Sequence, residues 1–298
     1  MTIAVCCVSP EGIALGADST TSYMAQGGGF HYLNHNQKIF EVGQKSALGI
    51  LTWGLASVGS ISHRTLVAQL GDVLNKSSPA SVASACESWV DIFWPNYQTF
   101  WTTQIALVRS LDAKSPYDAG APLSADMRTD AEESTYQQLK MGLVVGFCIG
   151  GHILNDRTPT AFEMIFDPLS PHKPVPAPIS ETRCWGAPKV FSRIVHGIDP
   201  EITQAIINSG KWSGTTKELE TLMGEHQLYL PNLPMRDAID FVHSCIASTI
   251  KTLKFSHLSQ TCGGPIEIAV ITSDRDFRWV RHKEWDAAIK EGHAEWKI

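Results

Sequence analysis

The chain has 298 residues, which accommodates one large α/β domain or two smaller ones. Its 24 Lys and Arg against 30 Asp and Glu give a formal charge of −6, and the absence of a basic block argues against a nucleic-acid partner. No segment approaches the ~18 apolar residues of a membrane span, and the first residues lack the pattern of a signal peptide. Seven cysteines are an odd number and do not indicate a disulfide framework. We therefore expect a cytoplasmic protein with reduced thiols and no membrane partner.

The first fifth of the chain is predicted to be a β meander. Alternating or continuous apolar runs are bounded by turn residues such as Pro10, Gly12 and Gly43. The strands expected there are residues 2–8, 13–17, 39–42 and 47–51.

Helices are predicted from residue 60 onward, and strands return in the middle and at the end of the chain. Apolar residues at helical spacing indicate helices at 60–78, 82–94, 189–196 and 234–255, with Pro95 interrupting the second. Residues 112–135 are expected to form a loop and 168–178 a Pro-rich connector, and strands are expected at 141–149, 161–166 and 266–271. This segregated order favours packed sheets and helices over βαβ alternation.

Thr2 is the first candidate for chemistry, because removal of Met1 would place a free α-amine beside its hydroxyl. A hydroxyl is a weak nucleophile at neutral pH and needs a base. The α-amine has an ordinary pKa of ~7.7–8.0 and can serve as that base. A nearby lysine would favour the neutral amine, and an aspartate would hold that lysine in place.

Asp18 and Lys38 are the candidates for these supporting roles, because both lie at strand ends of the same meander as Thr2. Taken alone, Asp18 fits a turn residue and Lys38 a solvated charge. Together with Thr2 they form a pattern, in which Asp18 follows Thr2 by 16 residues and Lys38 follows Asp18 by 20.

These residues resemble the start of a proteasome-type β-subunit, a family of N-terminal-nucleophile (Ntn) hydrolases that includes bacterial homologues of the Anbu type. The family has a threonine nucleophile, an aspartate sixteen residues later and a lysine some sixteen beyond that. The longer second spacing here coincides with residues 26–30, which the resemblance places near the substrate pocket. Gly54 matches the family glycine whose backbone N–H forms the oxyanion hole.

The resemblance implies an α+β fold, a four-layer α/β/β/α sandwich with two antiparallel sheets. It implies a single domain over residues 1–298, with insertions near 99–140 and 210–230 and a C-terminal extension at 281–298. The implied activity is that of a threonine peptidase acting on peptides or unfolded proteins, with Thr2, Asp18, Lys38 and Gly54 as its site. A homo-oligomer, ring-like in the family, is also implied, and neither a cofactor nor a metal is expected.

The sequence departs from the family where a supporting serine is replaced. The serine of the family's Gly-Ser-Gly motif corresponds to Ala187 in this chain. The aspartate and the serine of the family's Asp-x-x-Ser motif correspond to Ser259 and Cys262. The residues that orient the amine are therefore altered, and we expect slow turnover.

Two other functions fit the same residues. A non-catalytic structural subunit on this fold would not need the catalytic trio, which this chain retains. An Ntn amidase acting on a small amide would suit the long insertions. Cleavage preference, ring size and an ATPase partner are left open by the sequence.

Overall fold

The computed structural model of the chain describes residues 2–24, 29–120, 124–154, 156–227, 232–257 and 259–283. These residues form a mixed α+β fold with two five-stranded sheets and eight helices. Every strand pair within the two sheets is antiparallel, as the sequence predicted.

The first sheet carries the N-terminal strands at its centre. Its order is β12-β1-β2-β13-β14. The bounds are β1 Ala4–Ser9, β2 Gly12–Ala17, β12 Arg183–Trp185, β13 Glu267–Thr272 and β14 Arg275–Arg281.

The second sheet packs against the first and has the order β11-β10-β9-β6-β5. Its strands are β5 Ile39–Glu41, β6 Leu48–Gly54, β9 Val145–Ile153, β10 Asp156–Phe166 and β11 Ala177–Ile179. Two small hairpins accompany the sheets, β3 Thr21–Met24 with β4 Phe30–Leu33, and β7 Ser57–Val58 with β8 Ile61–Ser62.

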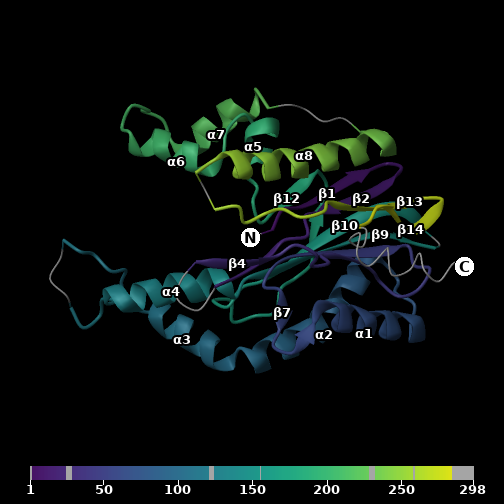
Figure 1. Ribbon diagram of the computed structural model, residues 1–298, viewed down its shortest axis with the longest axis horizontal. Coiled ribbons are helices and arrows are strands. Elements are labelled where there is room, and N and C mark those ends of the chain that lie inside the picture. Colours follow the sequence, from purple (N-terminus) through teal and green to yellow (C-terminus); the bar gives the residue numbers. More distant parts are fainter. Residues whose placement is uncertain are drawn as a thin grey trace, which may run out of the picture.

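Helices cover the outer side of each sheet. In Figure 1, α8 runs along the first sheet, whereas α1 and α2 lie beyond the second. The helices are α1 His63–Lys76, α2 Val82–Phe100, α3 Thr102–Asp112, α4 Asp130–Gly142, α5 Lys189–Val195, α6 Pro200–Asn208, α7 Thr216–Gly224 and α8 Met235–Phe255.

The central strands β1, β2, β6, β9 and β13 are buried on both faces, because their alternating side chains pack in opposite directions. In β1, Val5 and Cys7 face α8, while Ala4 and Cys6 face the second sheet. In β6, Ile50 faces α1 and α2. The three largest apolar clusters of the described residues therefore lie between the sheets and under each group of helices.

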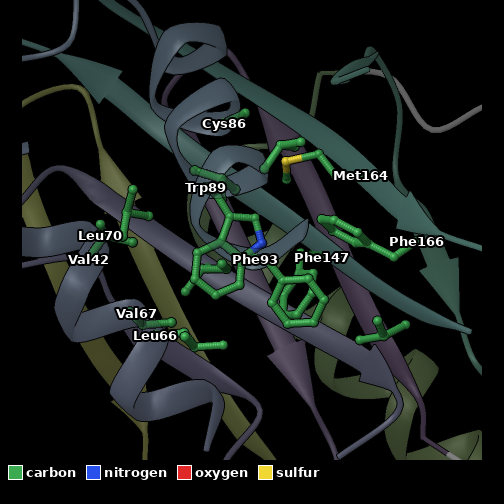
Figure 2. Packing of buried hydrophobic residues seen from close by; sticks show 14 of the residues in the cluster. Val42, Leu66, Val67, Leu70, Cys86, Trp89, Phe93, Phe147, Met164 and Phe166 are labelled. Atoms are coloured by element: carbon green, nitrogen blue, oxygen red, sulfur yellow. The ribbon is translucent and has the colours of Figure 1, made fainter. Parts of the chain in front are cut away.

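The largest apolar cluster lies between α1, α2 and the second sheet (Figure 2). Trp89, Phe93 and Tyr97 recur every four residues along α2 and are fully buried. The Phe93 ring lies 4.7 Å from that of Phe147 on β9. These aromatic residues therefore belong to the core of the chain itself.

The predicted interruption of α2 at Pro95 is wrong, because the helix continues to Phe100. Pro95 lies on the exposed face of α2, while Phe93 and Tyr97 on either side of it are buried. Packing of these rings holds the helix together across the missing N–H. The Asn96 side chain also donates a 2.8 Å hydrogen bond to the Ile92 carbonyl in the same turn.

The predicted loop at 112–135 is also too long, because α4 begins at Asp130. Thr129 and Glu132 form a reciprocal capping box that starts this helix. Tyr136 is the buried residue of α4 and packs with Val108 and Leu111 of α3. Within the described part of the chain, no helix combines the length and the apolar character needed to cross a bilayer.

Candidate active site

A pocket of about 810 Å³ opens where the ends of the two sheets meet. Thr2 precedes β1 of the first sheet, while Lys38 precedes β5 and Gly54 ends β6 of the second. All three line this pocket, so the structure brings together predicted site residues from both sheets. Asp18 lies directly behind them at the end of β2.

Asp18 and Lys38 form a buried ion pair, with 2.6 Å between Lys38 Nζ and Asp18 Oδ1. The Asp18 side chain has no exposed surface, and that of Lys38 is 4% exposed. Lys38 Nζ also donates to the Thr20 carbonyl at 2.7 Å. An ammonium has three donors, so one remains beyond the two acceptors found in the described structure.

The Asp18 carboxylate also accepts three backbone N–H bonds. Ile3 donates to Oδ1 at 3.0 Å, while Thr20 and Gly263 donate to Oδ2 at 3.2 and 2.9 Å. These bonds compensate for the removal of the carboxylate from water. They also tie the residue after Thr2 and the segment before β13 to one side chain.

The backbone at Thr2 is enclosed, and the residue is 6% exposed. The Asp18 N–H donates to the Ile3 carbonyl at 3.1 Å, which extends the pairing of β1 with β2 toward Thr2. On the other side Gly186, with φ +79°, packs so closely that a Cβ there would lie 1.9 Å from the Thr2 carbonyl oxygen. Only glycine fits at this position.

Gly54 is exposed at the end of β6 and has φ +86°. A Cβ there would lie 2.3 Å from the Val144 carbonyl oxygen. Any larger residue would therefore strain the backbone where it borders the pocket.

A second buried carboxylate, Glu267, lies beside the first. It faces Ala17 across the β2–β13 pairing and has no exposed surface. His282 Nδ1 and Lys283 Nζ lie 2.7 and 2.9 Å from its two oxygens. Lys283 also donates to the Asn36 carbonyl at 3.2 Å.

His63 contributes a buried imidazole to the pocket wall at the start of α1. Its Nδ1 lies 3.5 Å from Thr52 Oγ1, and its ring contacts Phe93 and Phe147 edge-on. Burial among these apolar groups disfavours the charged form and lowers the pKa of His63 to about 4.

The cysteines are poor alternatives to Thr2 as nucleophiles. Cys6 and Cys7 are buried within β1, and burial raises the pKa of the Cys7 thiol. Cys262 has no exposed surface, and burial together with the charge of Asp18 raises the pKa of its thiol to about 12. These two thiols are therefore protonated at neutral pH, whereas a reactive cysteine needs its thiolate.

The three positions that depart from the family motif do not line the pocket. Ala187 packs at the edge of the cluster under α8, and Ser259 is exposed. Cys262 is buried next to Gly263, whose N–H binds Asp18. Within the described residues, no cluster of three or more His, Cys, Asp or Glu is arranged to hold a metal ion.

Comparison with known proteins gives a match at the level of the fold. No family model and no curated protein matches the chain. The structure is similar to that of an Anbu (Gly-1) mutant from Hyphomicrobium sp. strain MC1, with a TM-score of 0.50, 13% identity, and coverage of 99% of this chain and 93% of that one. Anbu (ancestral beta-subunit) from Yersinia bercovieri follows with a TM-score of 0.48, 12% identity, and coverage of 98% and 93%.

The fold is therefore similar to that of Anbu over nearly the whole length of the chain, which confirms, at the level of the fold, the resemblance noted in the sequence.

The sequence identified one side of the pocket and missed the other. The residues of the meander were predicted from their positions at strand ends. His63 and Arg64 enter the pocket from α1, and His282 and Lys283 enter it from the end of β14. These last two lie in the segment 281–298 that was predicted to be an extension, of which residues 284–298 lie outside the described part. Residues 26–28 of the predicted pocket loop at 26–30 and Met1 also lie outside it.

We expect Lys38→Met to destabilise the protein by about 3 kcal/mol, because it leaves the Asp18 carboxylate buried without its counter-charge. Urea unfolding monitored by tryptophan fluorescence measures this loss. Lys173→Met is the matched control, since the Lys173–Asp91 pair is 60% and 64% exposed and contributes at most about 1 kcal/mol. Equal losses in the two variants would contradict the role assigned to the buried pair.

We also expect His63 to make stability pH-dependent. Its folded pKa of about 4 lies below the ordinary 6.5, so the unfolded chain takes up the proton first and stability falls as the pH drops from about 6.5 to about 4. The full loss is about 3 kcal/mol.

The expected result is that His63→Leu removes this part of the acid destabilisation. Urea midpoints of both proteins between pH 7 and pH 4 measure it. His172→Leu, at an exposed histidine, serves as the control and should retain the pH dependence of the unsubstituted protein. If His63→Leu and the parent lose stability in parallel, the assignment is wrong.

Proposed function

We propose that the chain is an Ntn hydrolase of proteasome type, a threonine peptidase that uses Thr2 as its nucleophile after removal of Met1. The observation that carries the proposal is that Thr2, Lys38 and Gly54 line one pocket with the Asp18–Lys38 pair at its base. These residues supply groups that acyl transfer by an N-terminal threonine can use, namely a hydroxyl nucleophile, a cation in the same pocket and a backbone donor.

The proposed reaction begins with attack of Thr2 Oγ1 on the scissile carbonyl. The free α-amine of Thr2 accepts the hydroxyl proton, and the charge of Lys38 favours the neutral, basic form of that amine. The Gly54 N–H stabilises the oxyanion, and the scissile C–N bond breaks as the Thr2 α-amine passes the proton to the leaving amine of the substrate. Water then hydrolyses the acyl-enzyme. Asp18 acts as a positioning residue, because it binds Lys38 rather than the substrate.

The proposal includes the finer description of the fold and of the chain. Helices outside each of two facing sheets agree with a four-layer α/β/β/α sandwich. We propose a single domain in which 99–140 and 210–230 are insertions, the first of which contains α3 and most of α4. A cytoplasmic location and peptide or unfolded-protein substrates belong to the same proposal.

We expect Thr2→Ala to lower kcat/KM for fluorogenic peptides by at least about 1,000-fold, because it removes the nucleophile. Thr2→Ser should retain measurable activity, since a hydroxyl stays beside the amine. Lys38→Ala and Asp18→Ala should also remove activity. Because these two substitutions also destabilise the protein, the comparison of Thr2→Ala with Thr2→Ser is the more direct test of the nucleophile.

Intact mass of the purified chain shows whether Met1 is removed, and an epoxyketone or β-lactone probe identifies the labelled residue. Full activity in Thr2→Ala, or labelling of Cys6 or a serine, would refute the mechanism. A probe-reactive Thr2 that cleaves small amides but no peptide would favour the amidase. An unreactive, folded chain would favour the structural subunit.

We further propose a homo-oligomer whose interface includes the helices of residues 60–101. The charged fraction is only 18%, and Val73 on α1 and Phe100 on α2 are 43% and 50% exposed. Light scattering at micromolar concentration should give a multiple of 32.7 kDa. Val73→Glu should weaken assembly, whereas Val175→Glu, at an 82% exposed site, should not. A monomeric mass for the parent protein would exclude the oligomer.

A further inference from the structure

The pocket wall carries an unbalanced set of charges. Among the described lining residues are three cations, and none is an aspartate or a glutamate. The cations are Lys38, Arg64 and Lys283, accompanied by the imidazoles of His35, His63 and His282.

The two carboxylates near the pocket are fully buried behind its cations. Asp18 binds Lys38 and Glu267 binds Lys283, and neither carboxylate has exposed surface. A ligand in the pocket therefore meets the ammonium groups first. Each buried pair is neutral as a whole, and the remaining charge of the wall is that of Arg64.

Arg64 is the exposed cation of this wall, and its described partner is a neutral amide. Its Nη2 donates to Gln37 Oε1, and its guanidinium lies 5.5 Å from the centre of the Phe40 ring. Both contacts hold the planar group at the pocket without neutralising it. A guanidinium has five donors, which suits it to a carboxylate.

The first turn of α1 adds to the same field. Ser62, His63 and Arg64 all line the pocket, and this turn contains no acidic residue. The N-terminus of a helix carries a partial positive charge that favours an anion. The charge of Arg64 and the helix dipole therefore act in the same direction.

We propose that this pocket selects an acidic side chain, glutamate or aspartate, on the acyl side of the scissile bond. The proposal rests on the proposed peptidase function, because the acyl-side residue stays attached to Thr2 and its side chain must enter the space beside Thr2 and Gly54. Arg64 binds the carboxylate, and Lys283 and the His282 imidazole, which line the same pocket, are further donors. Charge-assisted bonds of this kind are stronger than neutral ones.

The competing expectation is an apolar side chain, since Phe40, Trp53 and Trp279 also line the pocket. Two of these rings are already engaged. Trp53 stacks on Trp185 at 4.4 Å, and Trp279 stacks on His282 at 4.2 Å between ring centres. We therefore expect the charged residues of the wall, rather than these rings, to determine which side chain the pocket prefers.

Two fluorogenic peptides that differ only in glutamate or glutamine next to the fluorophore test the proposal, because the two side chains have the same shape. We expect the glutamate peptide to be cleaved with about tenfold higher kcat/KM, and a leucine peptide to rank below it. Arg64→Gln should bring the glutamate-to-glutamine ratio close to one, and Arg64→Lys should restore part of it. Arg275→Gln, at the far end of β14, removes the same charge and should leave the ratio unchanged.

Raised ionic strength should lower the preference of the parent protein. Equal cleavage of the glutamate and glutamine peptides, or faster cleavage of the leucine peptide, would overturn the inference while leaving the peptidase proposal intact. If no peptide is cleaved, the peptidase proposal fails, and the preference of the pocket for an acidic side chain is then tested by measuring peptide binding. Calorimetry with Thr2→Ala and the two amidated peptides should then give tighter binding of the glutamate form, and equal Kd values would overturn it.

Discussion

The ion pair between Asp18 and Lys38 is the interaction on which the candidate site depends. Asp18 follows a strand of the first sheet and Lys38 precedes a strand of the second, so one 2.6 Å contact connects the two sheets at the end where Thr2 lies. A buried charge pair is sustained only when its remaining hydrogen-bonding capacity is satisfied. The backbone N–H groups of Ile3, Thr20 and Gly263 provide this, and in doing so they fix three separate segments around one carboxylate.

The surroundings of the pair leave little freedom to the backbone near Thr2. Gly186 contacts the Thr2 carbonyl from one side, and Asp18 holds Ile3 from the other. The carboxylates of Asp18 and Glu267 are buried in the interior, and the ammonium groups of Lys38 and Lys283 lie between them and the pocket. The result is a rigid base bearing a hydroxyl, and a polar wall to which α1 and the end of β14 contribute.

The sequence was informative where local pattern and chemistry coincide. Thr2, Asp18, Lys38 and Gly54 lie at strand ends, and strands with continuous apolar runs were recognisable. Arg64 and Lys283 were not predicted, because only tertiary packing brings a helix start and a distant strand end to the same pocket. The continuation of α2 through Pro95 was missed for the same reason, since ring packing outweighs the local cost of proline.

The burial of both faces of the central strands has a consequence for how such sequences diverge. A position between two apolar layers is constrained in volume and polarity but accepts many residue types, so neighbouring positions can drift together while the layers are preserved. Over time this erases recognisable similarity from most of a chain. The similarity of this fold to that of Anbu at 13% identity agrees with such tolerance of substitution.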